Sequence, residues 1–335
     1  MIQKSNSLAQ TLIISGMHRS GTSLTASLLA STGINLGQKL LQSNNSNQKG
    51  HFESIDFLDF HRNVLYSQGV STDGWTLNKS ITVPEQFLVE AKSIVQKNIS
   101  QPVWGWKEPR TILFLDFWAN LLPEAKFVFV YRSPWEVIDS LYRRGDPTFT
   151  NNPNFALQVW LNYNEIIRDF CDRFSSKCLL FKLEYIIKEP NILVTSIKDK
   201  FGITLKKVDN LYEEKLLHNE VASSHRPVLI KTYFPEAVAL YQELDERAVN
   251  FKEFDNCSIC EIDSFPSYSA WVFQDWLNLR LLETKLKDIK FNLNQTQNQL
   301  NQTQAMLIAM QGSKFWKLRN FWFRLKKVIG LPNND

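Results

Sequence analysis

Hydrophobic residues follow two different spacings along the chain up to residue 201. Continuous apolar or β-branched runs are typical of strands buried on both faces of a sheet, and they occur at 11–15, 103–106, 127–131 and 179–183. Between them, apolar residues at helical spacing predict helices that start near residues 24 and 134 and others over 57–65, 84–97, 112–122, 155–174 and 191–201. This alternation predicts a three-layer α/β fold, with a mainly parallel sheet flanked by helices.

The first apolar run leads into a polar turn that resembles a phosphate loop. Gly16 and Gly21 enclose Met-His-Arg-Ser, and a helical pattern follows, so backbone N–H groups converge at the positive end of a helix. The frame matches G-x-x-x-x-G-K-[ST], except that Thr22 replaces the lysine and Arg19 supplies the charge. No aspartate ends the strand at 127–131, so we expect no metal, and the loop suits a sulfuryl group better than a more highly charged phosphoryl group.

The C-terminal part carries a seven-residue repeat. Valine or leucine recurs at every seventh position from Val272 to Leu307, and a second apolar residue or threonine follows three residues after most of them. This pattern predicts a coiled coil, most simply a homodimer, and the threonines leave a single extended helix as the alternative. Wound as a helix, 314–329 separates an aromatic-rich apolar face from a basic face.

Charge is concentrated at the C-terminus. The 335 residues carry a net charge of +4, of which 314–335 contribute +5 and the remainder −1, so we expect no binding of nucleic acid by the main body. For the basic helix we expect reversible attachment to an anionic membrane, with packing against protein as the alternative. The predicted organisation is a catalytic domain over 1–262, a helical heptad segment over 263–313 and a basic amphipathic helix over 314–335.

No apolar segment has the length of a signal-peptide core or a membrane span, which predicts a cytoplasmic protein. The basic C-terminal helix would place this protein at the inner face of the membrane, as a peripheral protein. Four cysteines fit this compartment. We expect Cys171 and Cys178 to be ordinary buried thiols. Cys257 and Cys260 have no second pair or histidine nearby, so chance spacing is a better interpretation than a zinc or redox site.

Several segments together resemble one enzyme family. The loop at 19–23 is similar to the 5′-phosphosulfate loop of sulfotransferases that use 3′-phosphoadenosine 5′-phosphosulfate (PAPS), in the arginine-containing form of tyrosylprotein and many bacterial members. Further matching segments lie at 106–110, 122–140 and 181–186. The resemblance covers residues 11–260, but the family's G-x-x-G-x-x-K segment is missing after 213–227, which leaves the donor contacts of that region open.

The resemblance implies transfer of a sulfuryl group from PAPS to an acceptor hydroxyl. It assigns the phosphosulfate to Arg19 and to a backbone cradle made by Ser20, Gly21, Thr22 and Ser23. It assigns the 3′-phosphate to Arg132, at the end of a strand, and to Ser140, eight residues later on the next helix. Lys107 would meet the sulfate and the bridging oxygen. The alternative for Lys107 and Arg110 is a structural ion pair with Glu108 or Asp116, and for Arg110 the two interpretations have equal weight.

The resemblance also places a general base shortly after the first helix. Glu53 matches this position, and a helix-capping role is its structural alternative. His51 is the rival base, whereas His18 and His61 are expected to be ordinary loop and helix residues. The expected acceptor is an oligosaccharide, a glycolipid or another lipid-linked glycan, and protein tyrosine is the alternative. A small-molecule kinase or nucleotide triphosphatase, or a non-catalytic membrane-associated scaffold, remain the competing functions.

Overall fold

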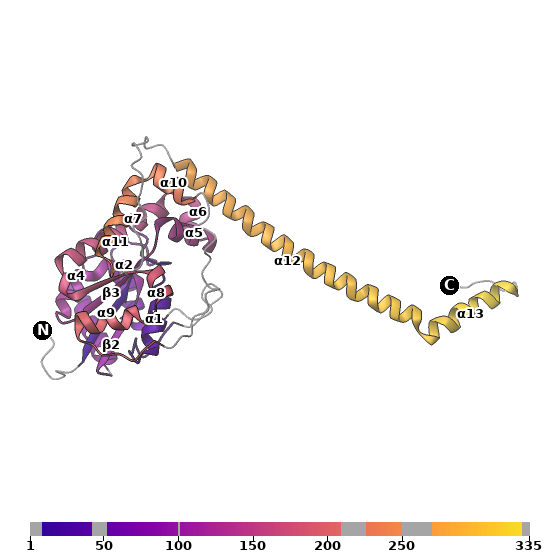
Figure 1. Ribbon diagram of the computed structural model, residues 1–335, viewed down its shortest axis with the longest axis horizontal. Helices are drawn as coiled ribbons and strands as arrows, with labels where there is room; N and C mark the ends of the chain where they lie inside the picture. The colour runs from indigo at the N-terminus through magenta and orange to yellow at the C-terminus, as the bar shows by residue number, and fades with distance from the viewer. Residues whose placement is uncertain (1–8, 42–51, 100, 209–225, 250–269, 330–335) are drawn as a thin grey trace. The chain divides into compact units, whose positions relative to one another are not determined.

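The computed structural model describes residues 9–41, 52–99, 101–208, 226–249 and 270–329 (Figure 1). The chain forms two compact units, Met1–Leu277 and Asn278–Asp335. The predicted boundary between residues 262 and 263 lies outside the described residues, as do His51, Cys257 and Cys260.

A parallel sheet forms the centre of the first unit. Its strand order is β2-β1-β3-β4, and all three neighbouring pairs are parallel. The strands are β1 (Gln10–Ser15), β2 (Val103–Lys107), β3 (Lys126–Tyr131) and β4 (Cys178–Lys182). Ile14 is opposite Lys107 on one side and Val128 on the other, and Tyr131 is opposite Lys182. The carboxyl ends of the strands therefore meet at one edge of the sheet, where ligands bind in open α/β folds.

Helices cover both faces of this sheet, which confirms the predicted α/β architecture (Figure 1). Leu12, Ile14, Val128 and Val130 point into one apolar cluster, while the alternate residues of the same strands enter the other. The first cluster is completed by α1 (Thr22–Ser31), α8 (Leu183–Lys188) and α9 (Ile192–Phe201). The helices of the second cluster include α2 (Ile55–Ser67), α3 (Leu88–Asn98), α4 (Leu115–Leu121), α5 (Pro134–Arg144), α7 (Phe155–Arg173), α10 (Arg226–Tyr233) and α11 (Pro235–Arg247).

Two local predictions need correction. The helix expected over 112–122 is a 3-10 helix, η2 (Pro109–Phe114), followed by α4, because the chain turns at Pro109 directly after β2. The sequence also suggests Ser133 as the cap of the helix that starts at Pro134, but the Ser133 hydroxyl donates to the carboxylate of Glu136 and does not cap a backbone N–H. The remaining short elements are η1 (Glu85–Phe87), α6 (Pro147–Asn151) and η3 (Ser175–Lys177).

Two helices form the C-terminal segment. Helix α12 (Ala270–Gly312) is continuous over 43 residues, and Val272, Phe273, Trp276 and Leu277 at its start are buried. From Leu279 onward the leucines of the heptad are exposed, so the coiled coil stays a prediction. Ser313 is extended and accepts a hydrogen bond from the N–H of Trp316, which starts α13 (Lys314–Val328). Within the described ranges, no helix combines the length and the apolar character needed to cross a bilayer.

Candidate functional site

The predicted anion loop connects β1 to α1 at the carboxyl edge of the sheet. A Cβ atom on Gly16 would lie 2.2 Å from the carbonyl oxygen of Val130, so only glycine lets the loop approach β3 this closely. Gly21 has a φ of +93° at the start of α1, a conformation that glycine adopts readily. The hydroxyl of Ser20 is buried and has no hydrogen-bond partner among the described residues. The loop therefore offers a buried donor beside a helix N-terminus, a setting that suits an anionic oxygen.

Arg19 links this loop to α5. Its Nε atom donates to Oγ of Ser140 over 2.8 Å, so two residues 121 positions apart in the chain are in direct contact. The sequence had assigned Arg19 and Ser140 to opposite ends of the donor. Their contact brings the two predicted anion sites well within the length of one nucleotide.

Positive charge accumulates around Arg19. Burial lowers its pKa from 12.5 to about 10, and the neighbouring charges of Arg144, Arg143 and Arg132 act in the same direction. Arg132 forms an ion pair with Glu136 at 3.0 Å. A group of arginines that repel one another is stabilised by a bound multivalent anion, because the anion interacts favourably with all of them.

Lys107 lies at the end of β2, between the loop and the candidate base. Its side chain is 1% exposed, and its Nζ atom donates to Oγ of Ser23 at 3.1 Å and contacts Oε1 of Glu53 at 2.9 Å. Asp116, one of the structural partners considered from the sequence, instead pairs with Arg173. Lys107 is thus positioned to contact both the anion loop and Glu53.

The backbone around Glu53 is held in place by a short bridge to residues 39–41. The N–H of Leu41 donates to the carbonyl of Glu53 over 2.8 Å. Phe52, immediately before Glu53, has a φ of 51°, and Arg19 has a φ of 70°; among the described residues these two are the non-glycine residues with positive φ. Such conformations are costly and concentrate at functional sites. Arg19 lies in the same loop as Ser23, and Phe52 adjoins Glu53, so both lie next to contacts of Lys107, which supports this region as the site.

A buried network lies directly behind the site, and only its ion pair between Arg110 and Glu108 had been considered from the sequence, as the structural alternative for Arg110. Glu108 contacts Nδ1 of His61 at 2.7 Å and Nη1 of Arg110 at 2.6 Å, and Nε2 of His61 accepts from the indole N–H of Trp118. Burial lowers the pKa of His61, although its hydrogen bond to Glu108 opposes this shift. Burial raises the pKa of Glu108, but Arg110 and His61 outweigh this effect and hold it far below its usual value.

These contacts give Arg110 a structural partner and make His61 a fully buried residue rather than an ordinary helix-face one. The network fixes the segment that carries Lys107, because Lys107 and Glu108 are consecutive in the chain.

A second buried cluster surrounds Asp139, the residue before Ser140. Asp139 is fully buried; one carboxylate oxygen accepts from the indole N–H of Trp276 at 3.0 Å and lies 3.3 Å from Arg226, and the other contacts Arg143 at 3.1 Å. The cluster joins α5, α10 and the first turns of α12. It therefore anchors the helix that presents Ser140 to Arg19.

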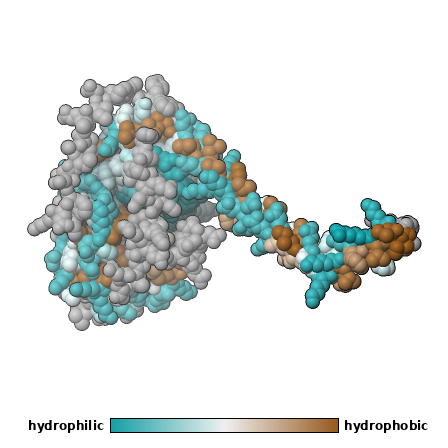
Figure 2. Space-filling view, turned by 45° about the vertical axis from the view of Figure 1, so that its right-hand side comes forward, coloured by the Kyte–Doolittle hydropathy of each residue, from teal (hydrophilic) through white to brown (hydrophobic). Residues whose placement is uncertain are grey.

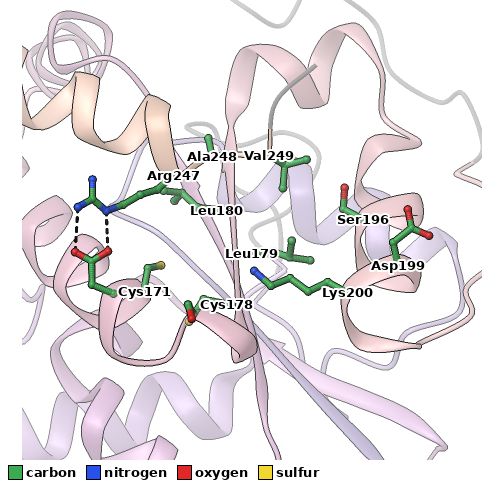
Figure 3. A pocket seen from close by; sticks show the side chains of 12 residues that line it. Cys171, Cys178, Leu179, Leu180, Ser196, Asp199, Lys200, Arg247, Ala248 and Val249 are labelled. Carbon is green, nitrogen blue, oxygen red and sulfur yellow. Dashed lines mark hydrogen bonds and ion pairs between the residues drawn. The ribbon is translucent and has the colours of Figure 1, made fainter. Parts of the chain in front are cut away.

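A cavity of about 840 Å³ lies at the opposite, amino-terminal end of β4 (Figure 3). Its walls include Arg247, which pairs with Asp172, and the two free thiols of Cys171 and Cys178, which are buried as expected. A hydrogen bond with Cys178 and burial raise the pKa of Cys171, so this thiol stays protonated and unreactive. The cavity contains none of the predicted site residues. In the described part of the chain, no three His, Cys, Asp or Glu side chains group as metal ligands.

Comparisons with known proteins identify the family of this chain. Residues 11–207 match the model of the sulfotransferase family. A putative protein-tyrosine sulfotransferase from Caenorhabditis briggsae is 24% identical over 219 residues, which are 63% of this chain and 69% of that protein.

Two solved structures are also similar, with TM-scores below one half. The sulfotransferase from Alicyclobacillus acidocaldarius has a TM-score of 0.42 and 14% identity, covering 72% of this chain and 97% of that one. Sulfotransferase STF9 from Mycobacterium avium has a TM-score of 0.44 and 11% identity, covering 71% and 76%. Because the family model matches more than half of the sequence, this chain belongs to the sulfotransferase family, whose members transfer a sulfuryl group from PAPS to an acceptor.

Proposed function

We propose that this protein transfers the sulfuryl group of PAPS to a hydroxyl group of a glycan or glycolipid, with the residues of the candidate site in defined roles. The contact between Arg19 and Ser140 carries the proposal. PAPS has a phosphosulfate at one end and a ribose 3′-phosphate at the other, so its site needs two anion-binding regions joined within one nucleotide length. The loop over 19–23 would take the phosphosulfate, and Arg132 with Ser140 the 3′-phosphate.

The proposed reaction is an in-line displacement at sulfur. The acceptor oxygen forms a bond to sulfur, the bond from sulfur to the bridging oxygen breaks, and 3′-phosphoadenosine 5′-phosphate (PAP) leaves. Glu53 takes the proton from the acceptor hydroxyl, which is too weak an acid to lose it unaided. Lys107 and Arg19 stabilise the negative charge that develops on the departing oxygen. The contacts of Lys107 with Glu53 at 2.9 Å and with Ser23 at 3.1 Å support this assignment, because they place both groups beside the loop that would hold the phosphosulfate.

Binding of PAP tests the donor assignment most directly. We expect calorimetry on the purified chain to show PAP binding without added metal, and weak or no binding of magnesium-ATP. The reverse result would favour a small-molecule kinase or nucleotide triphosphatase. PAPS binding with no transfer to any acceptor would favour a non-catalytic scaffold.

Replacement of the proposed base separates chemistry from binding. Glu53→Gln removes the proton acceptor but keeps the shape of the side chain, so we expect sulfate transfer to fall by about 10²- to 10⁴-fold. PAP affinity should change little. Glu90→Gln, on the exposed side of α3, is the matched control and should retain full activity. Equal transfer rates for Glu53→Gln and wild type would remove Glu53 from this role and turn attention to His51.

The second part of the proposal is the chemical class of the acceptor, a glycan or glycolipid. The resemblance of the loop over 19–23 to that of bacterial sulfotransferases implies a glycan acceptor, and a lipid-linked glycan would be accessible to an enzyme held at the cytoplasmic face of a membrane. The relative from Caenorhabditis briggsae is named a putative protein-tyrosine sulfotransferase, so a tyrosine hydroxyl is the competing acceptor. A screen distinguishes the two acceptor classes. PAPS-loaded enzyme is offered glycans, glycolipids and tyrosine peptides, and a sulfated product is recognised by a mass increase of about 80 Da, the mass of one SO₃ group.

We also propose that the heptads of α12 form a homodimeric coiled coil. Leu286, Leu293, Leu300 and Leu307 are 48% to 63% exposed, and pairing with a second copy would bury them. Leu293→Glu with Leu300→Glu should turn a sedimenting dimer into a monomer. Gln295→Glu with Gln302→Glu adds the same charge away from the seam and should leave the dimer intact. A wild-type monomer at high concentration would instead favour the single extended helix.

A further inference from the structure

Helix α13 exposes an unusually apolar surface for a charged helix. Its apolar positions are between 37% and 88% exposed: Phe315, Leu318, Phe321, Trp322, Leu325, Val328 and, just after the helix, Ile329. Figure 2 shows apolar and polar residues side by side along the C-terminal segment. An exposed apolar surface of this kind marks an interaction site.

The apolar residues share one face of α13. At about 100° per residue they fall within a continuous stripe. Lys317 and Arg324 border one edge of the stripe, and Arg319 and Lys326 border the other. Long cationic side chains at the edges of an apolar stripe can reach lipid headgroups while the stripe enters the acyl region.

The charge of α13 has one sign. Lys314–Val328 contains six lysines and arginines and no acidic residue. The other two aromatic residues, Trp316 and Phe323, lie on the polar face, where the guanidinium of Arg319 stacks at 5.0 Å and 5.1 Å from their rings. Two copies of such a helix repel each other, whereas an anionic surface attracts every one of its cations.

We propose that α13 binds in the plane of an anionic phospholipid surface, with its apolar stripe in the outer acyl region. Its 15 residues span about 22 Å, which is shorter than the hydrocarbon core of a bilayer of about 30 Å, so it lies on the membrane and does not cross it. Ser313 caps α13 separately from α12, which gives the helix its own start. The proposal does not depend on the sulfotransfer chemistry.

Vesicle partitioning of the full-length chain tests this proposal. We expect the protein to co-sediment with vesicles of phosphatidylcholine and phosphatidylglycerol, and at least about tenfold less with phosphatidylcholine alone. Phe321→Ser with Trp322→Ser should lower partitioning by at least about tenfold, because each aromatic ring loses its burial in the acyl region. Lys317→Gln with Arg324→Gln should lower it by about 30-fold, since each cation near an anionic surface contributes about fivefold.

A matched variant controls for composition. Trp316→Ser with Phe323→Ser also removes one tryptophan and one phenylalanine, but from the polar face, and should change partitioning by less than about threefold. The proposal would be overturned if both aromatic double variants lost vesicle partitioning equally. It would also be overturned if the wild-type chain bound neutral and anionic vesicles equally. Unchanged vesicle binding in Phe321→Ser with Trp322→Ser, together with loss of self-association, would identify a second copy of the chain as the occupant instead.

Discussion

The hydrogen bond from Arg19 to Ser140 brings the two proposed anion-binding regions into direct contact. Arg19 is half-buried, has a left-handed backbone and lies among other arginines, so its orientation depends on the few acceptors that contact it. Ser140 is one of these acceptors, at 2.8 Å. A bound 3′-phosphate would add a further anionic partner to this group of arginines, beside carboxylates such as Glu136 that already pair with them.

Ser140→Ala tests this role. Hydrogen bonds to charged groups contribute about 1.5–3 kcal/mol, so we expect PAP affinity to fall by roughly tenfold or more, measured by calorimetry. Ser27→Ala is the control, because the hydroxyl of Ser27 bonds only within α1, to the carbonyl of Leu24. Unchanged PAP affinity in Ser140→Ala would place the 3′-phosphate elsewhere.

Burial of His61 should make the folded protein less stable at mildly acidic pH. Burial lowers its pKa below the usual 6.5, so below that pH the unfolded chain binds a proton that the folded chain resists. Stability is therefore complete above pH 6.5 and falls on acidification by up to about 1.4 kcal/mol per pH unit. The pKa of Glu108 is lowered in the fold, so the stability that this carboxylate contributes is lost only at a pH below the usual glutamate pKa of 4.5.

His61→Gln keeps a donor for Glu108 and an acceptor for Trp118 but does not titrate. Urea unfolding between pH 6.5 and about 5.5 should show a flatter stability profile for this variant than for wild type. His18, whose pKa burial also lowers, is present in both proteins and cancels in the comparison. Parallel profiles would show that His61 does not take up the proton.

Among helices, α5 couples the donor region to the start of α12. Trp276 donates to Asp139, and Asp139 adjoins Ser140. Trp276→Phe keeps an aromatic ring in the core and removes this donor. We expect PAP affinity to fall severalfold, by calorimetry, with a loss of a few degrees in Tm.

Phe273→Leu is the matched variant for that experiment. Phe273 is fully buried one turn earlier in α12 and stacks against Trp276 and Phe234. Its replacement should lower Tm similarly but leave PAP affinity close to wild type. Affinity losses that simply follow Tm in both variants would contradict a positioning role for Trp276.

Sequence pattern predicted the strands well and the contacts behind the site poorly. Strands buried on both faces are continuous apolar runs, and the loop over 16–23 has a local motif, so both could be recognised from the sequence. The pairs His61–Glu108 and Trp276–Asp139 are separated by 47 and 137 residues, and neither leaves a periodic signal. The sequence contained one local signal for these pairs, an acidic residue directly next to a candidate site residue: Glu108 follows Lys107, and Asp139 precedes Ser140.

At the scale of the entire chain, the two units should be separable at a defined point. A chain that ends at Leu277 keeps Trp276 and the other buried residues of early α12, so we expect it to fold and to bind PAP while losing vesicle binding. A chain that ends at residue 269 lacks these residues and should show a clearly lower Tm. Equal melting temperatures for both shortened chains would show that the first turns of α12 are dispensable.

The position of Lys107 has a consequence for the timing of catalysis. Its ammonium group contacts Ser23 and Glu53 together, so it restrains Glu53, the proposed base, as long as no stronger anion competes for it. An arriving phosphosulfate would draw the ammonium toward itself and release Glu53 to accept a proton. This implies an ordered kinetic scheme in which the donor enters first. Product-inhibition patterns that indicate random addition of donor and acceptor would contradict the release of Glu53 by donor binding.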